Sequence, residues 1–380
     1  MTPMEPAARL PAWPAAWGEP PGSALIRATP EDFQVTELPG FDLSGAGEHA
    51  YLLLQKRSLN TAELAERIAR LSGVALREIG YSGLKDRNAL TRQWFSVGLA
   101  GRQAPDWHAL ESPGDVRVLA LGAHQRKLRR GTHAGNQFQL VLRELRGKPA
   151  DLNGRLELLR QRGVPNYFGP QRFGRDGATL RQALRWAARP ARVSRARRGL
   201  FYSALRAYLF NRLLALRVEE GYWNAVCAGD VCILAGSRSY FRAGGDDGEL
   251  QARLDAGDIH PGLPLWGVAG RSDAAVPVEL RAKLATDAAL CAFLEEQGLE
   301  LAWRPTRMLP DDFSWRFCDD DSLQLSFTLG AGSYATALLA ELANCREGVT
   351  ATTTTTTTTT AADGHGDRGI GKSDKRSEQG

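Results

Sequence analysis

The sequence predicts an α+β protein, and three observations support that class. Stretches in which apolar and polar residues alternate, as in strands, are interspersed with stretches whose apolar residues recur at helical spacing. The links between them are short, and strands and helices do not alternate regularly, which argues against a wound parallel sheet. The chain has 380 residues, enough for two domains or for one domain that carries a large insertion.

The composition is that of an ordinary globular protein. Apolar residues make up 43% of the chain and charged residues 24%, and both values are typical. No apolar run approaches the ~20 residues of a membrane span, and no basic segment followed by an apolar core marks a signal peptide. The five cysteines form no CxxC pair, which favours free thiols in a reducing compartment. We therefore expect a cytoplasmic protein.

The first half of the chain is predicted to contain most of the strands. The proline-rich residues 1–22 are expected to form an irregular lead-in. Helical spacing predicts a helix that begins at Asn60, with Glu63 as its reciprocal cap, and ends at Gly73. A second helix is predicted from Asp151, as its cap, to Gly163. Strands are predicted at residues 24–29, 33–38, 49–56, 92–99, 116–123 and 137–144.

One glycine-rich match in this half is expected to have no cofactor function. Residues 45–50 fit the pattern GxGxxA, which opens a helix in dinucleotide-binding proteins. Here the match leads into a predicted strand instead. We therefore interpret residues 40–47 as a hairpin loop.

The second half is predicted to contain more helix. One helix is expected after Gly174 and ends before Pro190, because proline cannot continue a helix. Further elements are predicted as helices at residues 201–220, 286–297 and 336–343, and as strands at residues 226–235, 239–242 and 323–329. From residue 348 onward, nine consecutive threonines and glycine-containing polar residues predict a disordered tail, to which no function is assigned.

A polar loop at residues 80–91 is the centre of the functional hypothesis. It leads into the strand predicted at residues 92–99, and loops at the edge of a sheet often carry functional side chains. Asp86 is its only acid, and Lys85 and Arg87 beside it are expected to keep it ionised. The residues alone leave two interpretations open. The loop is either a surface turn with a local ion pair, or it presents a carboxylate that acts as base or nucleophile.

Basic residues are concentrated in two segments, although the net charge of the chain is only +5. Residues 172–217 contain twelve arginines and one acid, Asp176, so that this segment carries +11 and the remainder −6. Residues 126–130 form a second basic cluster. Because the planar fork of arginine suits phosphate, this pattern favours a polyanion site over the alternative of a solvated helix face.

The glycine-rich residues 330–335 raise a competing hypothesis. They follow a predicted strand and open a predicted helix, which is the context of a dinucleotide fingerprint. A dinucleotide fold needs further strand–helix units after this point, and none is predicted. The sequence also lacks the motifs GxxxxGK[ST] and HExxH and the zinc-deaminase pair of motifs. We therefore expect no nucleotide cofactor and no metal.

Several stretches of the chain carry a family resemblance when they are taken together. They are Pro30-Glu31-Asp32-Phe33, Gly83-Leu84-Lys85-Asp86-Arg87, Lys127-Leu128-Arg129 through Gly135-Asn136-Gln137-Phe138, residues 164–174 and Ala331-Gly332-Ser333-Tyr334-Ala335-Thr336. In this order they resemble the motifs of the tRNA pseudouridine synthase D (TruD) family. The resemblance covers roughly residues 25–344, and the co-occurrence is more specific than any single motif.

The resemblance implies an activity and an architecture. Members of this family isomerise uridine in tRNA to pseudouridine, at position 13, with an aspartate and without a cofactor. The implied fold is a pseudouridine synthase catalytic domain, with a mixed β-sheet and flanking helices, interrupted by an inserted α/β TRUD domain. The implied boundaries are 1–22 for the lead-in, 23–162 and 311–347 for the two parts of the catalytic domain, 163–310 for the insertion and 348–380 for the disordered tail.

The resemblance also implies roles for two charged residues. Asp86 matches the catalytic aspartate, which either adds to the uracil ring or abstracts a ribose proton, and the sequence does not decide between these chemistries. Arg27 lies where the family commonly carries a basic residue paired with this carboxylate. Asp86 is thus expected to work as an ion pair with Arg27.

Other residues match family positions near the target nucleotide. A base in folded RNA has to be extruded before it reacts, and stacking on an aromatic ring compensates part of that cost. Phe33, Phe138 and Tyr334 match such aromatic positions. Asn136 matches a substrate contact, and its amide offers a donor and an acceptor to a uracil edge.

The predicted partner is tRNA, and basic residues are expected to bind its phosphates. Lys85 and Arg87 either grip phosphate or hold the loop. The other predicted RNA-binding residues are Arg126, Lys127, Arg129, Arg172, Arg195, Arg197 and Arg198. We expect a monomer without membrane contacts. The alternative of a non-catalytic RNA-binding protein would explain the arginines but leaves Asp86 without a role.

Overall fold

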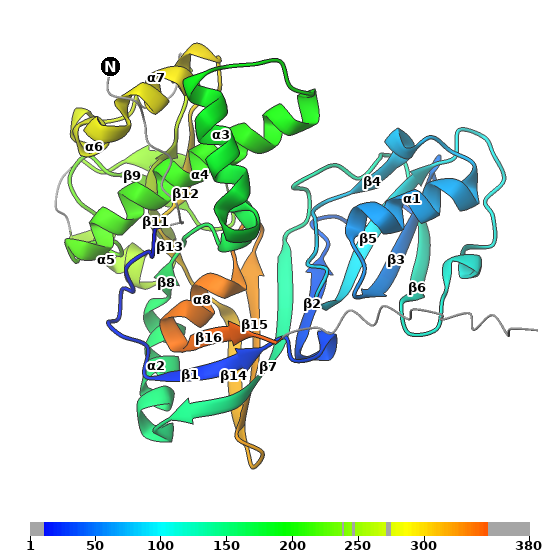
Figure 1. Ribbon diagram of the computed structural model, residues 1–380, viewed down its shortest axis with the longest axis horizontal. Helices are drawn as coiled ribbons and strands as arrows, with labels where there is room; N and C mark the ends of the chain where they lie inside the picture. The colour runs from blue at the N-terminus through cyan, green and yellow to red at the C-terminus, as the bar shows by residue number, and fades with distance from the viewer. Residues whose placement is uncertain (1–10, 238, 245–247, 271–274, 349–380) are drawn as a thin grey trace, which may run out of the picture. The chain divides into compact units, whose positions relative to one another are not determined.

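A ten-stranded mixed sheet is the largest element of the fold (Figure 1). The computed structural model describes residues 11–237, 239–244, 248–270 and 275–348. The strands of this sheet are β1 (Gly22–Ile26), β2 (Phe33–Leu38), β3 (His49–Arg57), β4 (Ile79–Tyr81), β5 (Leu90–Gly98), β6 (Val116–His124), β7 (Gly135–Gly147), β14 (Asp311–Cys318), β15 (Ser322–Gly330) and β16 (Asn344–Glu347). The order is β14-β15-β7-β2-β5-β3-β6, with β1 paired to β7 and β16, and β4 paired to β5.

Strand β7 connects early and late parts of the chain within this sheet. It has 13 residues and pairs antiparallel with β2 on one side and with β15 on the other. Phe138 therefore lies opposite both Val35 and Phe327. The strands predicted in the first half and at residues 323–329 are confirmed, except that the one predicted at residues 24–29 begins at Gly22 and ends at Ile26, and the α+β class is confirmed as well.

The loop at residues 40–47 does not close a hairpin. Strand β5 lies between β2 and β3, parallel to β2 and antiparallel to β3. The prediction of a hairpin loop is therefore wrong. The local pattern identified both strands correctly, but it carried no information on a partner strand that enters the sheet about fifty residues later.

Helix α1 (Thr61–Ser72) lies across strands β3 and β5 (Figure 1), and its apolar face is buried against them. Gly73 ends the helix with a φ of 65°, which a residue without a Cβ adopts easily. Asn60 occupies the N-cap position, but its side chain makes no capping hydrogen bond, and Glu63 pairs with Arg67 at 3.1 Å. The predicted helix is confirmed and its reciprocal cap is not.

A second, four-stranded sheet lies in the middle of the chain and is antiparallel, in the order β10-β9-β11-β12. Its strands are β9 (Val231–Leu234), β10 (Tyr240–Arg242), β11 (Ile259–Leu265) and β12 (Ala302–Pro305). The helices of this region are α3 (Ala178–Ala188), α4 (Arg195–Glu219), α5 (Gly248–Asp255), α6 (Val278–Lys283) and α7 (Ala288–Glu296). The sequence predicted α3 and α7 well and missed β11, β12, α5 and α6.

Helix α4 is six residues longer at its start than the predicted 201–220. Ser194 caps it, because its Oγ accepts a hydrogen bond from the Arg197 backbone N–H at 3.3 Å. Phe201, Leu205 and Leu213 are buried on its inner face. The early start places Arg195, Arg197 and Arg198 in the first turn of the helix.

The remaining elements are short or connect the two sheets. They are α2 (Pro149–Arg162), α8 (Ala335–Leu342), β8 (Val164–Pro165) and β13 (Arg307–Met308), with short 3-10 turns at Pro30–Asp32, Leu76–Glu78, Trp107–Leu110, Pro170–Phe173, Arg175–Gly177 and Ala285–Asp287. Asp151 lies in the first turn of α2, whose N-cap is Lys148, so the predicted cap is wrong by three residues. None of the described helices has the length and apolar character that a membrane span requires.

One hydrophobic cluster extends from the main sheet into the helical region. It includes Leu140 and Phe327 from the sheet, Leu205 from α4 and Leu338 from α8, all at most 2% exposed. The described part of the predicted lead-in, residues 11–21, has no helix or strand, as expected. The tail predicted from residue 348 lies outside the described residues except for its first residue.

Candidate active site

The loop of residues 82–89 connects β4 to β5 and is held by buried polar side chains. Thr61, the first residue of α1, accepts a hydrogen bond from the Lys85 backbone N–H (3.0 Å) and its hydroxyl bonds to the Gln93 side-chain oxygen (2.9 Å). The Gln93 amide donates in turn to the Gly83 carbonyl (3.3 Å). Because Thr61 and Gln93 are buried, these bonds fix the backbone of the loop and give its side chains a rigid support.

The Asp86 carboxylate is paired with Arg27 and not with its neighbours in the sequence. One carboxylate oxygen accepts a hydrogen bond from Arg27 Nη2 at 2.8 Å, and the other accepts one from the Asn88 backbone N–H at 3.1 Å. The Asp86 side chain is 26% exposed. The described ion pairs of Asp86 include neither Lys85 nor Arg87, which the sequence suggested as its partners. The residue that directly follows β1 thus supplies the cation.

Arg27 is held in an unusual conformation. Its φ of 55° lies in the left-handed region, which residues other than glycine rarely adopt. Its guanidinium lies 4.0 Å from the centre of the Phe33 ring, and Nη1 donates to Glu347 of β16 at 2.7 Å. Only 7% of the Arg27 side chain is exposed, against 63% for Glu347. Arg27 therefore bridges two carboxylates, and Glu347 is a neighbour of the site that the sequence did not indicate.

Lys85 points into the protein. Its ammonium lies 2.9 Å from Glu37 in β2 and donates to Asn136 Oδ1 in β7 at 2.5 Å. The Lys85 and Glu37 side chains are 6% and 1% exposed. The Lys85 charge also acts on His133: together with burial, which is the larger cause, it lowers the pKa of the His133 imidazole. Of the two roles that the sequence left open for Lys85, this geometry matches holding the loop. Arg87 is exposed, and both roles stay open for it.

Lys56 also supports the loop, and sequence reasoning missed it. It is fully buried and donates to the backbone carbonyls of Leu59 (2.7 Å) and Asp86 (2.9 Å). Burial lowers the pKa of Lys56 to about 8, although the Asp86 charge opposes this effect. A signal was present, because the inward positions of β3, Leu52 and Leu54, continue to Lys56. We call Arg27, Lys56 and Lys85 the inner cations.

Phe33 and Phe138 lie together beside Arg27, and both are buried. Their rings meet edge to face at 6.3 Å, and Phe138 also stacks on Phe327 at 5.2 Å. Their exposed fractions are 4% and 6%. In this arrangement the two rings support Arg27 and the sheet. That a base stacks on either of them stays a prediction.

Tyr334 belongs to a different group of side chains. Its hydroxyl accepts a hydrogen bond from Arg172 Nε at 3.0 Å, and its ring meets Phe168 edge to face at 5.9 Å. Arg172 also donates to Ser203 of α4 at 2.8 Å. The structure thus joins Tyr334 to Arg172 rather than to Phe33. Arg172, predicted to bind RNA, is engaged in protein contacts on two of its nitrogens.

The topology argues against the dinucleotide hypothesis for residues 330–335. Strand β15, which precedes them, runs antiparallel to both of its neighbours, β7 and β14. A dinucleotide fold requires parallel strands joined by a crossover helix. The Gly332 carbonyl accepts a hydrogen bond from Arg304 Nη1 at 2.9 Å, so this segment is tied into the protein. In the part of the chain that the structure describes, no cluster of three or more His, Cys, Asp or Glu residues could hold a metal ion.

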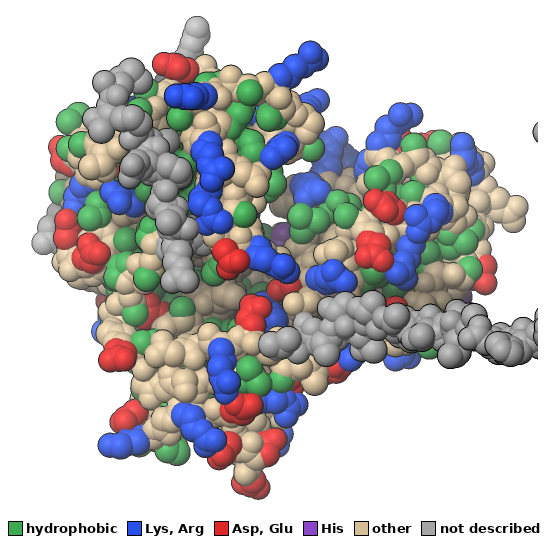
Figure 2. Space-filling view, viewed as in Figure 1, with side chains coloured by type: hydrophobic (Ala, Val, Ile, Leu, Met, Phe, Trp, Pro, Cys, Tyr) green, Lys and Arg blue, Asp and Glu red, His purple; other side chains and the backbone are tan. Residues whose placement is uncertain are grey.

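Basic side chains gather over α3 and the start of α4 (Figure 2). Arg195, Arg197 and Arg198 are all exposed, and we call them the arginine turn. Arg197 donates to Gln182 at 2.9 Å, and the described ion pairs include none of the three. Farther along the same helix, Arg217 is 1% exposed and pairs with Asp230 at 2.8 Å. The arginine-rich segment therefore contains structural arginines as well as exposed ones.

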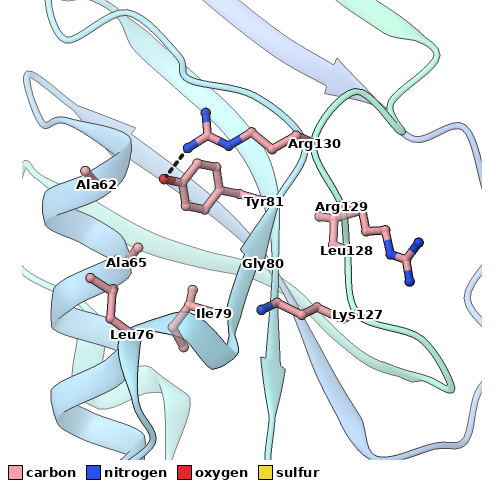
Figure 3. Close-up of a pocket in the computed structure, with 10 residues that line it drawn as sticks. All are labelled: Ala62, Ala65, Leu76, Ile79, Gly80, Tyr81, Lys127, Leu128, Arg129 and Arg130. Carbon is pink, nitrogen blue, oxygen red and sulfur yellow. Dashed lines mark hydrogen bonds between the residues drawn. The ribbon is translucent and has the colours of Figure 1, made fainter. Parts of the chain in front are cut away.

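The second basic cluster, residues 126–130, borders an open pocket (Figure 3). Arg126 and Arg129 are exposed, and Lys127 donates to the Arg77 carbonyl. Arg130 lies over the Tyr81 ring at 4.7 Å and donates to its hydroxyl at 2.9 Å. The pocket has a volume of about 430 Å³ and lies between this cluster, α1 and β4.

Comparisons of the sequence with known proteins match one family. The sequence model of the family described as tRNA pseudouridine synthase D (TruD) matches residues 16–183 and 178–342. A tRNA pseudouridine synthase D from Methylococcus capsulatus is 47% identical over 332 residues, which cover 87% of this chain and 93% of that protein. One from Pseudomonas putida is 45% identical, with 87% and 94% covered.

A solved structure shares the fold. It is the crystal structure of a Methanosarcina mazei protein assigned as a tRNA pseudouridine synthase D, with a TM-score of 0.62. The match covers 88% of this chain and 96% of that one at 19% sequence identity. This similarity supports the α+β architecture.

Proposed function

The chain belongs to the tRNA pseudouridine synthase D family, and from this premise we propose that Asp86 is its catalytic residue and uridine 13 of tRNA its target. The protein is a tRNA pseudouridine synthase, which isomerises uridine in tRNA to pseudouridine. The reaction breaks the bond between ribose and uracil N1, rotates the base and joins uracil C5 to the ribose. C5 loses a proton and N1 ends protonated, so that the atoms balance without a second substrate.

The Arg27–Asp86 ion pair is the observation that carries this proposal. It holds a partly exposed carboxylate 2.8 Å from a buried guanidinium, on a loop whose backbone is fixed. A charged group that is oriented in advance needs little reorganisation when the substrate reacts. Addition to the uracil ring and abstraction of a ribose proton both require the ionised carboxylate. Both chemistries therefore depend on this pair.

We infer that Asn136 contacts the uracil as a hydrogen-bond donor. Its Oδ1 accepts a hydrogen bond from Lys85 at 2.5 Å, which orients the amide. The amide nitrogen then faces away from Lys85 and suits a uracil carbonyl oxygen, which is an acceptor. The sequence predicted that Asn136 offers uracil both a donor and an acceptor. With its oxygen bonded to Lys85, we infer that it offers the donor.

The substitution Asp86→Asn tests the proposal, because it keeps the shape of the side chain and removes its charge. We expect pseudouridine formation to fall at least about a thousandfold, while tRNA binding stays within about tenfold, or about 1.4 kcal/mol. Asp42→Asn, at an exposed position, is the matched control and should keep full activity. Normal turnover by Asp86→Asn would remove Asp86 from the mechanism.

The proposed target needs a separate measurement. A tRNA transcript with uridine at position 13 should gain one pseudouridine there, and the same transcript with cytidine 13 should gain none. Mapping by carbodiimide modification and primer extension reads both. Pseudouridine at another position in both transcripts would show that the target assignment is wrong, without affecting the role of Asp86.

Three further expectations belong to the same proposal. All ten strands of the main sheet come from residues 22–147 and 311–347, which supports the predicted boundaries of the two catalytic parts. We propose that residues 163–310 form the insertion and that the protein acts as a monomer in the cytoplasm, where tRNA is modified. Limited proteolysis tests the boundaries of the insertion. Light scattering after gel filtration tests the monomer, and cell fractionation tests the location in the cytoplasm.

A further inference from the structure

We propose that the open pocket between α1, β4 and residues 127–130 binds a second, unpaired nucleotide of the tRNA, distinct from the target uridine (Figure 3). This inference rests on the proposed function, because it takes tRNA as the molecule that reaches this face. It goes beyond that function by assigning a binding site for a nucleotide that does not react. Three properties of the pocket carry it, namely its apolar wall, its charged rim and its link to the loop of residues 82–89.

The wall facing the pocket is apolar. Ala62 and Ala65 of α1 present only methyl groups, and Leu76 and Ile79 close one end (Figure 3). Leu76 is 51% exposed, so its side chain is accessible to a ligand at this end of the pocket. The volume of about 430 Å³ falls within the range of about 300–1,000 Å³ that is typical of small-ligand pockets. A nucleobase has the flat, largely apolar faces that fit such a wall.

The rim of the pocket carries only positive charge. Lys127, Arg129 and Arg130 line it, and no Asp or Glu does. The Arg130 guanidinium lies over the Tyr81 ring, with its Nη2 2.9 Å from the hydroxyl, and this layered pair is a platform on which a base can stack. The Arg129 guanidinium is exposed and points away from Tyr81 and from the apolar wall (Figure 3), so it is available to a phosphate outside the pocket. An apolar wall beside cations matches a nucleotide better than an apolar peptide.

The pocket shares its walls with the support of the Asp86 loop. Strand β4 forms one wall and runs directly into residues 82–89. The Gly131 N–H, next to Arg130, donates to the Ser82 carbonyl at 2.7 Å. Thr61, at the start of α1, accepts from the Lys85 N–H at 3.0 Å. A nucleotide in the pocket would therefore contact the same elements that position the catalytic loop, as a neighbouring part of one bound RNA would.

Filling the pocket tests the inference. Ala62 is exposed, so Ala62→Trp should occupy the pocket without disturbing the core, and Ala109→Trp places the same side chain on an exposed alanine away from it. With an unmodified tRNA transcript, Ala62→Trp should raise the Kd about tenfold while the single-turnover rate at saturating tRNA changes little. Ala109→Trp should bind as the wild type does. Equal Kd values for the two variants, with equal melting temperatures, would overturn the proposal.

A crosslink identifies the occupant. A photoreactive benzoylphenylalanine at position 62 of the full chain should couple to tRNA, and mapping should place the adduct on one nucleotide other than uridine 13. Coupling to the protein itself, or no coupling to tRNA, would contradict a nucleotide site. Because these readouts report binding, the pocket can fail while Asp86→Asn still abolishes the reaction, and the two proposals are distinguishable.

Discussion

The inner cations and the arginine turn show two different uses of positive charge in one protein. The inner cations are at most 9% exposed, and each binds an acceptor within the protein. The arginine turn is exposed, and the described ion pairs do not include it. Cations in the first turn of a helix also face the unfavourable end of its dipole. We infer that the inner cations fix the geometry of the site, whereas the arginine turn is available to a polyanion.

Among variants of the inner cations and their partners, the largest effect is expected for Arg27→Gln. Removing the guanidinium leaves the Asp86 carboxylate without its cation in a partly buried setting, which is costly. We expect the single-turnover rate to fall roughly a hundredfold, with an unchanged salt dependence of tRNA binding. Arg346→Gln is the control, because Arg346 pairs with Glu144 at an exposed position. A loss of affinity without a loss of rate would assign Arg27 to the same class as the arginine turn.

The next largest effect is expected for Lys56→Met, and it concerns the free energy of unfolding. The folded protein holds the pKa of Lys56 at about 8, below the ordinary value of 10.5, because of burial. Between these two values the unfolded chain binds more protons than the folded one. The stability that Lys56 contributes therefore rises with pH across this window. The free energy of unfolding of the wild type should gain up to about 3 kcal/mol relative to the variant between pH 7 and pH 10.

Urea unfolding at several pH values measures this difference. Lys148→Met removes an exposed lysine and serves as the control, since it should show no comparable change relative to the wild type. A constant difference between wild type and Lys56→Met across the window would mean that Lys56 is not buried as described. It would also remove one member from the inner cations.

The smallest effect is expected for Glu347→Gln. Glu347 pairs with Arg27 from an exposed position, and such pairs contribute little. We expect the rate at saturating tRNA to fall about twofold to fivefold, because Arg27 keeps Asp86 but loses its second anchor. Glu144→Gln, which breaks the neighbouring pair with Arg346, is the control. An effect as large as that of Arg27→Gln would mean that Glu347 takes part in the chemistry.

Local patterns predicted the elements whose structure is determined locally. Helix α1 and strands β5, β6 and β15 were identified because periodicity and end signals agree there. Strand β11 was missed because Pro261 and Pro264 lie within it, and proline normally argues against a strand. The start of α4 was missed although Ser194, a good capping residue, marks it. The hairpin error at residues 40–47 came from a long-range pairing.

In the candidate site, too, some residues were predictable from the sequence and others were not. The loop with Asp86 was identifiable from its residues, and the family resemblance added Arg27 as its partner. Lys85 was associated with Asp86 because the two are adjacent in the sequence, yet the fold turns Lys85 towards Glu37. Glu347 reaches Arg27 only because β16 pairs with β1, some 320 residues apart in the sequence. Such contacts depend on the tertiary fold and leave no local pattern.

A salt titration of tRNA binding, combined with single-turnover rates, tests the division between the two regions most directly. The variant is Arg195→Ala/Arg197→Ala/Arg198→Ala. The control is Arg146→Ala/Arg160→Ala/Arg162→Ala, which removes the same charge from arginines that pair with Asp321, Glu157 and Asp255. We expect the arginine-turn variant to lose about two units of log–log salt slope, at roughly 0.7–0.9 per phosphate contact, and to keep its rate at saturating tRNA. Parallel titrations for variant, control and wild type, or a lost rate at an unchanged slope, would contradict the account.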